Sequence, residues 1–188
     1  MKRSEINQLI RDATDCFESK HWALPPHPRW DVTDFGLGDW RRHGLVLVNL
    51  AEHEEYCEKL MYAKRGLVTP AHSHGKKKED IICRWGELQI RLWAEKPSPG
   101  TFDAISVLVN GQPQTFFSGE AVTLTAGERI TLEPGTWHEF APVSEECIIG
   151  EVSTANDDQN DNFFASDEVG RYAKIEEDEP CDVALLSD

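Results

Sequence analysis

The stretch GLVTPAHSHGKKKEDIICRWG, residues 66–86, places two histidines one residue apart and follows them with three lysines and a glutamate. In an extended strand, alternate side chains point to the same face, so His72 and His74 would project together toward one ion. Two exposed histidines on a Pro-, Gly- and Lys-rich surface loop are the alternative interpretation of this pair taken alone. The residues that surround the pair in the sequence decide between a metal site and a surface loop.

The same stretch fits a longer pattern of glycines around metal-binding side chains. Gly66, His72, His74, Glu79 and Gly86 stand at every defined position of G-x5-H-x-H-x4-E-x6-G, which is the first cupin motif. The glutamate adds a carboxylate to the two imidazoles. The pattern therefore favours a metal site over a surface loop.

A second, partial motif lies further along the chain in GERITLEPGTWHEF. Gly127, Gly135 and His138 keep the spacing of the second cupin motif, G-x5-P-x-G-x2-H-x3-N. Glu133 stands where the proline is usual, and Pro142 stands where the asparagine is usual. Chance agreement with both motifs in a β-rich sequence is remote, so His138 is predicted as a further ligand.

The predicted ligand set is His72, His74, Glu79 and His138. Three imidazole nitrogens and one carboxylate oxygen from two distant strand pairs would converge inside a small barrel. On an octahedral ion, four protein ligands leave two positions open, which suits a sugar presenting neighbouring oxygens. This geometry suits manganese, iron or cobalt better than a closed structural zinc site.

The pattern of apolar and polar residues from about residue 43 predicts an all-β fold. Short apolar or alternating runs such as GLVLVNL, ELQIRLW and CIIGEVS are separated by Gly, Pro and Asn. Together with the motifs they predict a cupin (double-stranded β-helix, or jelly-roll) barrel with an N-terminal helix and peripheral C-terminal segments. The expected organisation is a single cupin domain over residues 1–188, with a helix and arm in 1–42, the barrel in 43–155, and a closing segment and acidic tail in 156–188.

Local signals predict three further features. Ser4 is expected to cap an amphipathic helix that opens the chain. Residues 21–40 carry several prolines and glycines between aromatic residues, and are expected to form a long ordered loop. Asn110 and Gly111 are expected to form the turn of a β-hairpin.

Composition excludes several classes of partner. Lys and Arg total 19 against 34 Asp and Glu, a formal net charge of −15, which repels nucleic acid backbones and anionic membrane surfaces. No window approaches the roughly 20 apolar residues that a membrane-spanning helix needs. Five cysteines lie far apart with no C-x-x-C spacing. The expected location is the cytoplasm.

The whole chain resembles the cupin-type D-lyxose ketol-isomerases, from the N-terminal helix through PAHSHGKKKEDIICRWGELQIRLW and LEPGTWHEF to GEVSTANDDQNDNFF. This resemblance implies manganese-dependent interconversion of D-lyxose and D-xylulose, with D-mannose and D-fructose as the related six-carbon pair. It implies the four metal ligands given above. It also implies that Lys77 acts at the reacting carbons, and it calls for a glutamate that shuttles the proton.

Glu151 in IIGEVS is the candidate for this glutamate, while Glu139, Asp161 and Glu168 remain open. Arg171 in DEVGRYAKI is a candidate contact for the substrate. Lys77 and Glu151 would bind substrate as well as act on it.

Two other classes of function use the same ligands. An iron-dependent cupin dioxygenase would activate oxygen, and a sugar-binding cupin would bind a sugar without converting it. Phosphorylated sugars are a variant of the isomerase hypothesis that the acidic composition disfavours. Edge strands and an N-terminal arm favour a homodimer.

Overall fold

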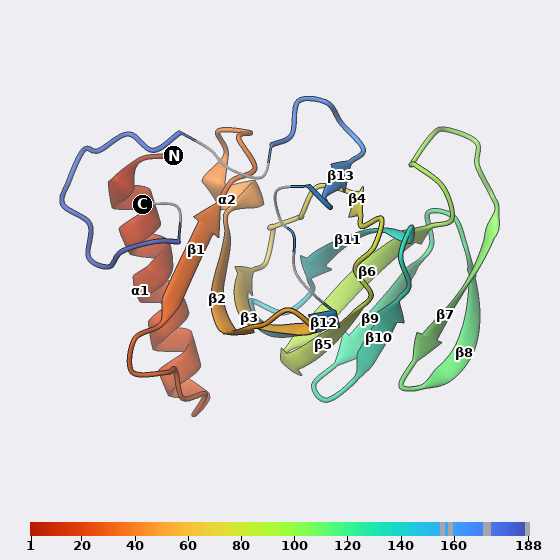
Figure 1. Ribbon diagram of the computed structural model, residues 1–188, viewed down its shortest axis with the longest axis horizontal. Helices are drawn as coiled ribbons and strands as arrows, with labels where there is room; N and C mark the ends of the chain where they lie inside the picture. Colours follow the sequence, from red (N-terminus) through yellow and green to blue (C-terminus); the bar gives the residue numbers. More distant parts are fainter. Residues whose placement is uncertain (155–156, 158–159, 171–173, 187–188) are drawn as a thin grey trace.

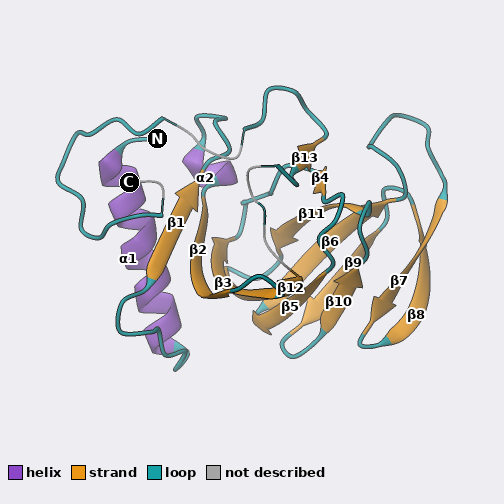
Figure 2. Cartoon of the chain, viewed as in Figure 1, coloured by secondary structure: helices purple, strands orange, loops and turns teal. Residues whose placement is uncertain are grey.

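Two antiparallel sheets form the body of the protein in the computed structural model, which describes residues 1–154, 157, 160–170 and 174–186 (Figures 1 and 2). The elements, in chain order, are α1 (Arg3–Ser19), β1 (Arg29–Thr33), α2 (Trp40–His43), β2 (Leu45–Glu52), β3 (Tyr56–Lys64), β4 (His72–Ser73), β5 (Glu79–Trp85), β6 (Glu87–Trp93), β7 (Ala104–Val109), β8 (Gln112–Phe117), β9 (Ala121–Thr125), β10 (Arg129–Leu132), β11 (Trp137–Pro142), β12 (Glu146–Thr154) and β13 (Phe163–Phe164).

The order of strands brings the two motif regions together. Across the described residues, one sheet has the order β1-β2-β3-β12-β5-β10-β7-β8 and the other has the order β13-β4-β11-β6-β9. Strand β12 pairs with both β3 and β5, and β11 lies between β4 and β6. The first motif contains β4 and β5 and the second contains β10 and β11, so each motif contributes one strand to each sheet. The predicted all-β cupin fold is confirmed.

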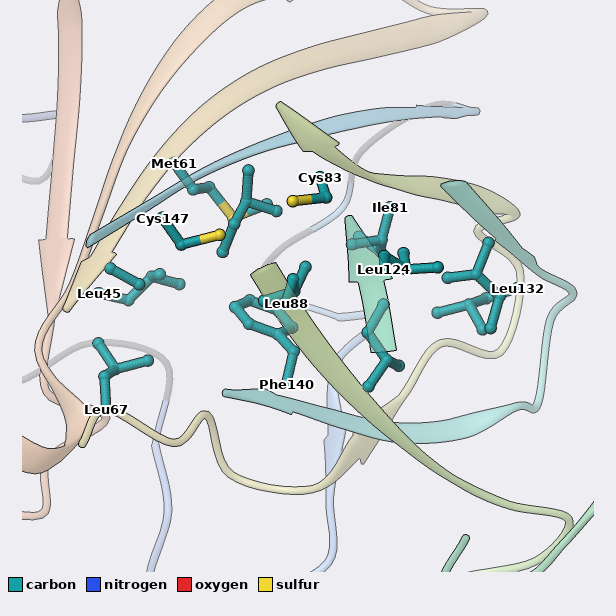
Figure 3. Packing of buried hydrophobic residues seen from close by; sticks show 14 of the residues in the cluster. Leu45, Met61, Leu67, Ile81, Cys83, Leu88, Leu124, Leu132, Phe140 and Cys147 are labelled. Atoms are coloured by element: carbon teal, nitrogen blue, oxygen red, sulfur yellow. The ribbon is translucent and has the colours of Figure 1, made fainter. Parts of the chain in front are cut away.

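The core lies between the sheets and is filled from both sides (Figure 3). Alternate side chains of β5 and β12 point inward, where Cys83 and Ile149 meet Leu88 and Leu124 of the opposite sheet. All four side chains are fully buried. A second apolar cluster lies on the outer face of β1, β2 and β3, which α1 covers (Figure 1).

The predicted N-terminal helix is confirmed, but the prediction that Ser4 caps it is wrong. Helix α1 begins at Arg3, so Ser4 lies in its first turn. The Ser4 backbone N–H donates to Asp178 Oδ1 at 2.9 Å, and its hydroxyl donates to Asp178 Oδ2 at 2.7 Å. The C-terminal segment returns over the start of α1, so its carboxylate satisfies a helix N–H that a capping side chain would otherwise have to satisfy.

The expected loop over residues 21–40 contains the edge strand β1, which the sequence interpretation missed. Its residues pair with β2, for example Val32 with Val46. The prolines that dominate this region precede the strand, and its glycines follow it. The predicted hairpin turn is confirmed: Asn110 and Gly111 have φ of 52° and 77° and join β7 to β8.

Candidate metal centre and active site

Three histidines meet at one end of the space between the sheets. His72 of β4 is the antiparallel partner of His138 of β11, and their ring centroids are 4.2 Å apart. His74 follows β4 directly. One ring nitrogen from each histidine lies within 4.8 Å of the other two, which is close enough for a shared metal ion. The structure thus brings these three residues of the two motifs together.

Hydrogen bonds set the orientation of all three rings. Each Nδ1 contacts a backbone carbonyl, and because a carbonyl oxygen only accepts, each Nδ1 carries the ring proton. The contacts are His72 Nδ1 to Pro70 O at 2.8 Å, His74 Nδ1 to Asp161 O at 2.7 Å, and His138 Nδ1 to Thr136 O at 3.1 Å. In the neutral rings, Nε2 is left as an unprotonated acceptor, which is the usual arrangement of metal-binding histidines.

Glu79 completes the set of acceptors. It lies at the start of β5 with 3% of its surface exposed. Its Oε1 lies 3.1 Å from His138 Nε2 and 3.6 Å from His74 Nε2. In the neutral tautomers these nitrogens cannot donate, and no other donor within the described part of the chain reaches this oxygen.

Buried acceptors that face one another in this way are stabilised by a cation between them. Three imidazole nitrogens with one carboxylate oxygen form a donor set that manganese, iron and cobalt accept. The residues present therefore fit the predicted divalent metal ion.

A cluster of lysines and carboxylates lies beside the histidines. Lys77 Nζ contacts Glu79 Oε2 at 3.1 Å and Glu151 Oε1 at 3.0 Å. Lys59 Nζ lies 3.8 Å from Glu151 Oε1, and Ser153 Oγ donates to the same oxygen at 3.2 Å. The two lysines and two glutamates are each at least 94% buried, so the four charges balance away from water.

Register explains why these charges meet. Glu151 of β12 is the antiparallel partner of Lys59 in β3, and Ser153, two residues along, is the partner of Glu79 in β5. Residues two apart share a face of a sheet, so all of these side chains point toward the second sheet. The structure thus brings together the predicted Lys77, Glu151 and Glu79.

The pKa values of Glu79 and Glu151 favour ionised carboxylates, and those of His72 and His74 favour neutral imidazoles. Burial alone would raise the pKa of Glu79, but Lys77 and the histidines hold it well below its usual 4.5. Burial likewise opposes ionisation of Glu151, and Lys59 and Lys77 lower its pKa below 4.5. Burial lowers the pKa of His72 well below 6.5 and lowers that of His74 as well. These are the protonation states that metal binding requires.

The histidines and the charged cluster line one cavity of about 60 Å³. A water molecule needs roughly 10–15 Å³ by this measure, so the cavity has room for an ion and several oxygen ligands. Its apolar lining comes from Leu47, Met61, Phe140 and Phe164, among others. A mostly apolar wall with a few convergent polar groups is typical of a small-molecule site.

The other carboxylates that the sequence left open have different surroundings. Glu139 accepts from Arg91 Nε at 3.1 Å, and neither residue lines the cavity. Glu168 is exposed and also lies outside the cavity lining. The Asp161 carboxylate accepts the backbone N–H groups of residues 75–77. Arg171, the candidate substrate contact, lies outside the described residues.

Lys59 is a charged cavity residue that the sequence interpretation missed. Lys59 is in phase with Met61 and Ala63 of β3, but Leu60 and Tyr62 at the alternate positions are apolar and buried too, so YCEKLMYAK has no polar–apolar period of two that would have marked Lys59. A lysine at an inward position of an apolar strand face is rare unless it has a partner or a function.

Comparison with known families gives a match over most of the chain. A family profile described as D-lyxose isomerase matches residues 28–188. The D-lyxose/D-mannose isomerase of Escherichia coli O157:H7 is 33% identical, covering 100% of this chain and 98% of that protein. The D-lyxose/D-mannose isomerase of Serratia proteamaculans is 34% identical, covering 96% of this chain and 94% of that protein.

Solved structures of L-ribose isomerases have a fold similar to that of this chain. The L-ribose isomerase of Cellulomonas parahominis, solved with L-ribose, superposes with a TM-score of 0.70 at 17% identity, covering 94% of this chain and 98% of that one. The L-ribose isomerase of Geodermatophilus obscurus superposes with a TM-score of 0.68 at 16% identity. At this level of identity the likeness concerns architecture.

Proposed function

The chain belongs to the D-lyxose isomerase family, and on that premise we propose that it is a metal-dependent aldose-ketose isomerase that interconverts D-lyxose and D-xylulose. D-mannose and D-fructose are the proposed six-carbon pair, as the names of two relatives suggest. One observation carries the proposal: the unpaired acceptor Glu79 Oε1 and three histidines face a cavity that also contains the buried Lys77–Glu151 pair.

The proposed ligands are His72, His74, Glu79 and His138, and the proposed ion is Mn²⁺, with Co²⁺ or Fe²⁺ as substitutes. When bound, such an ion stabilises negative charge on two neighbouring sugar oxygens. The three carbonyl contacts at Nδ1 fix the rings that receive it. Since the two lysines and two glutamates already balance, an added dication leaves the site positive for a substrate that develops negative charge.

Glu151 is proposed as the group that moves the proton between carbons. Its low pKa keeps it ionised, and a carboxylate of this kind accepts the C2 proton of the aldose as the enediol forms. The same carboxyl then returns the proton to C1, and the ketose results with no net change in the protein. Lys59 and Ser153 hold Glu151 Oε1 in place during the transfer.

Lys77 is proposed to serve the sugar oxygens. Its Nζ lies between Glu79 and Glu151 and adjoins both the ligand set and the proposed base. As O1 gains a proton and O2 loses one, an ammonium at this position donates to whichever oxygen carries more charge. Lys78, next in the sequence, is instead half-exposed and pairs with Glu133 at 2.6 Å.

The partner is proposed to be a small-molecule sugar, and the protein is proposed to act in the cytoplasm as a homodimer. No helix among residues that the structure describes is long and apolar enough to cross a membrane.

Phe102 and Phe117, 76% and 52% exposed near the β7–β8 hairpin, provide apolar surface for a second copy. Light scattering after size-exclusion chromatography measures the mass.

The function is tested by incubating Mn²⁺-loaded protein under nitrogen with D-lyxose and with D-mannose and measuring the ketose. Ketose formation that a chelator abolishes is expected, and it would exclude a dioxygenase because no oxygen is present. Binding of the sugars without conversion would instead indicate a sugar-binding protein. Failure to convert any pentose or hexose would refute the proposal.

A further inference from the structure

Asp161 joins the C-terminal segment to the loop that carries a metal ligand and a proposed catalytic lysine. Its carboxylate accepts three consecutive backbone N–H groups: Gly75 at 2.9 Å, Lys76 at 3.1 Å and Lys77 at 2.9 Å. Its backbone carbonyl accepts from His74 Nδ1 at 2.7 Å. One residue thus contacts four successive residues from 74 to 77.

This arrangement uses Asp161 as an anchor. Three successive N–H groups converging on an anion form a nest, and hydrogen bonds to an ionised acceptor are stronger than neutral ones. The side chain is 6% exposed, so water competes poorly for these bonds. Both carboxylate oxygens are engaged, since Lys76 N–H is shared between Oδ1 and Oδ2 at 3.1 Å each.

The segment that follows Asp161 reinforces the contact. Phe163 and Phe164 of β13 pair with Ser73 and His72 of β4, so the chain runs alongside the H-x-H sequence. Phe164 also lines the cavity. A Cβ on Gly75 would lie 3.2 Å from Asp161 Oδ1, which shows how closely the two chains approach.

We propose that Asp161 is a positioning residue that fixes the direction of His74 and the place of Lys77 together, so that binding a divalent ion and docking of residues 161–169 are coupled. The contact between His74 Nδ1 and the Asp161 carbonyl turns His74 Nε2 toward the proposed metal centre. The nest fixes the backbone from which Lys77 reaches Glu79 and Glu151. The catalytic part of this inference rests on the proposed isomerase function; the metal part does not.

The test compares Asp161→Asn and Asp161→Ala with the matched control Asp178→Asn. Asp178 also belongs to the C-terminal segment and accepts a backbone N–H, but at Ser4, in the first turn of α1. In Asp161→Asn, the amide can accept through one oxygen only, so at least the Gly75 or the Lys77 N–H loses its acceptor. In Asp161→Ala, all three lose theirs.

Three measurements are made on the full chain: affinity for Co²⁺ by competition with a chelator, the visible spectrum of bound Co²⁺, and hydrogen exchange of residues 161–169 with and without the ion. Both Asp161 variants are expected to bind Co²⁺ about 10–100-fold more weakly, with an altered spectrum, as for other partners of metal ligands. Co²⁺ should slow exchange in the segment of the unmutated protein and not in these variants. Asp178→Asn should match the unmutated protein in all three measurements.

Unchanged affinity and spectrum in both Asp161 variants would overturn the inference, and so would an equal loss in Asp178→Asn. If Asp161→Ala does not fold, Gly75→Ala takes its place, because the added Cβ presses on Asp161 Oδ1 and on the Phe163 ring. If the unmutated protein proves not to isomerise sugars, the proposed function fails while the Co²⁺ measurements still decide this inference. With isomerase activity present, kcat of Asp161→Asn should fall about 10–100-fold.

Discussion

The two halves of the barrel interior are built from the same strands but contain opposite chemistry. On three strands, a charged residue and two apolar residues share the inward face. In β3, Lys59 is followed by Met61 and Ala63, and in β5, Glu79 is followed by Ile81 and Cys83. In β12, Glu151 is preceded by Ile149 and Cys147. Within about two residues, paired charges give way to apolar side chains. Figure 3 shows the apolar half, with Cys83 and Cys147 near Leu88.

The difference teaches that stability and chemistry are separated along each strand. Burying an apolar side chain is favourable by about 1.5–3 kcal/mol, so the apolar half stabilises the fold. Buried charges gain little net stability even when paired, and removal of one partner is costly. The polar half is therefore held in place by the apolar half, and a bound cation would offset the repulsion among its acceptors. Four predictions test this separation.

The largest effect is expected for Glu151→Gln in the polar half. Glutamine is nearly the same size but cannot accept the proton, so kcat should fall by about 10²–10⁴-fold. Metal content should be unchanged, because Glu151 is not among the proposed ligands. Kinetics and metal analysis on the same sample check both points. Glu139→Gln, a change outside the cavity, is the matched control, and normal kcat in Glu151→Gln would assign the base elsewhere.

Leu88→Ala, in the apolar half, should lower the stability of the protein and leave its kcat unchanged. Leu88 is fully buried, and the cavity left by its removal should lower the free energy of unfolding by about 2–5 kcal/mol. Urea denaturation measures this loss. Because Leu88 does not line the cavity of the proposed metal site, kcat per folded molecule should stay near that of the unmutated protein. A proportionate loss of kcat would contradict the separation of the two halves.

Removal of the metal should act on the polar half alone. An ion that binds only the folded state at 100 times its Kd adds about 2.7 kcal/mol of stability. Thermal unfolding with Mn²⁺ and with a chelator should differ accordingly. In His138→Ala the difference should largely vanish, whereas in Leu88→Ala it should persist on a lower baseline. Equal responses in both variants would mean that the ion does not bind at the histidines.

Per titrating group and pH unit, the smallest effect is expected from pH on the metal-free protein. The pKa values of His72 and His74 are lowered in the folded state, so below their unfolded value of 6.5 the unfolded chain binds more protons and stability falls. Depressed pKa values at Glu79 and Glu151 extend this loss below 4.5. Each group contributes at most about 1.4 kcal/mol per pH unit. Urea midpoints from pH 7.5 to 4 measure the slope, which should be smaller in His72→Gln; an unchanged slope would place the titrating groups elsewhere.

Spacing along the chain predicts the candidate ligands but not their surroundings. His72, His74 and Glu79 lie within one short window of the chain that fits the first motif, and the partial second motif adds His138 as a candidate. Lys59 was missed because its role depends on register: it becomes part of the site only when β12 places Glu151 opposite it. Asp161 is separated from His74 by 87 residues, and no local pattern reports such a contact.

The sequence by itself determined the class of fold, the candidate metal ligands and the type of chemistry that such ligands support, because these follow from alternation, turn residues and ligand identity within short windows. Only the tertiary structure decided which carboxylate faces Lys77, which lysine shares Glu151, and that a backbone nest holds the loop between His74 and Lys77. Those facts depend on pairing between strands and segments far apart in the chain, where distance in space is unrelated to distance in sequence.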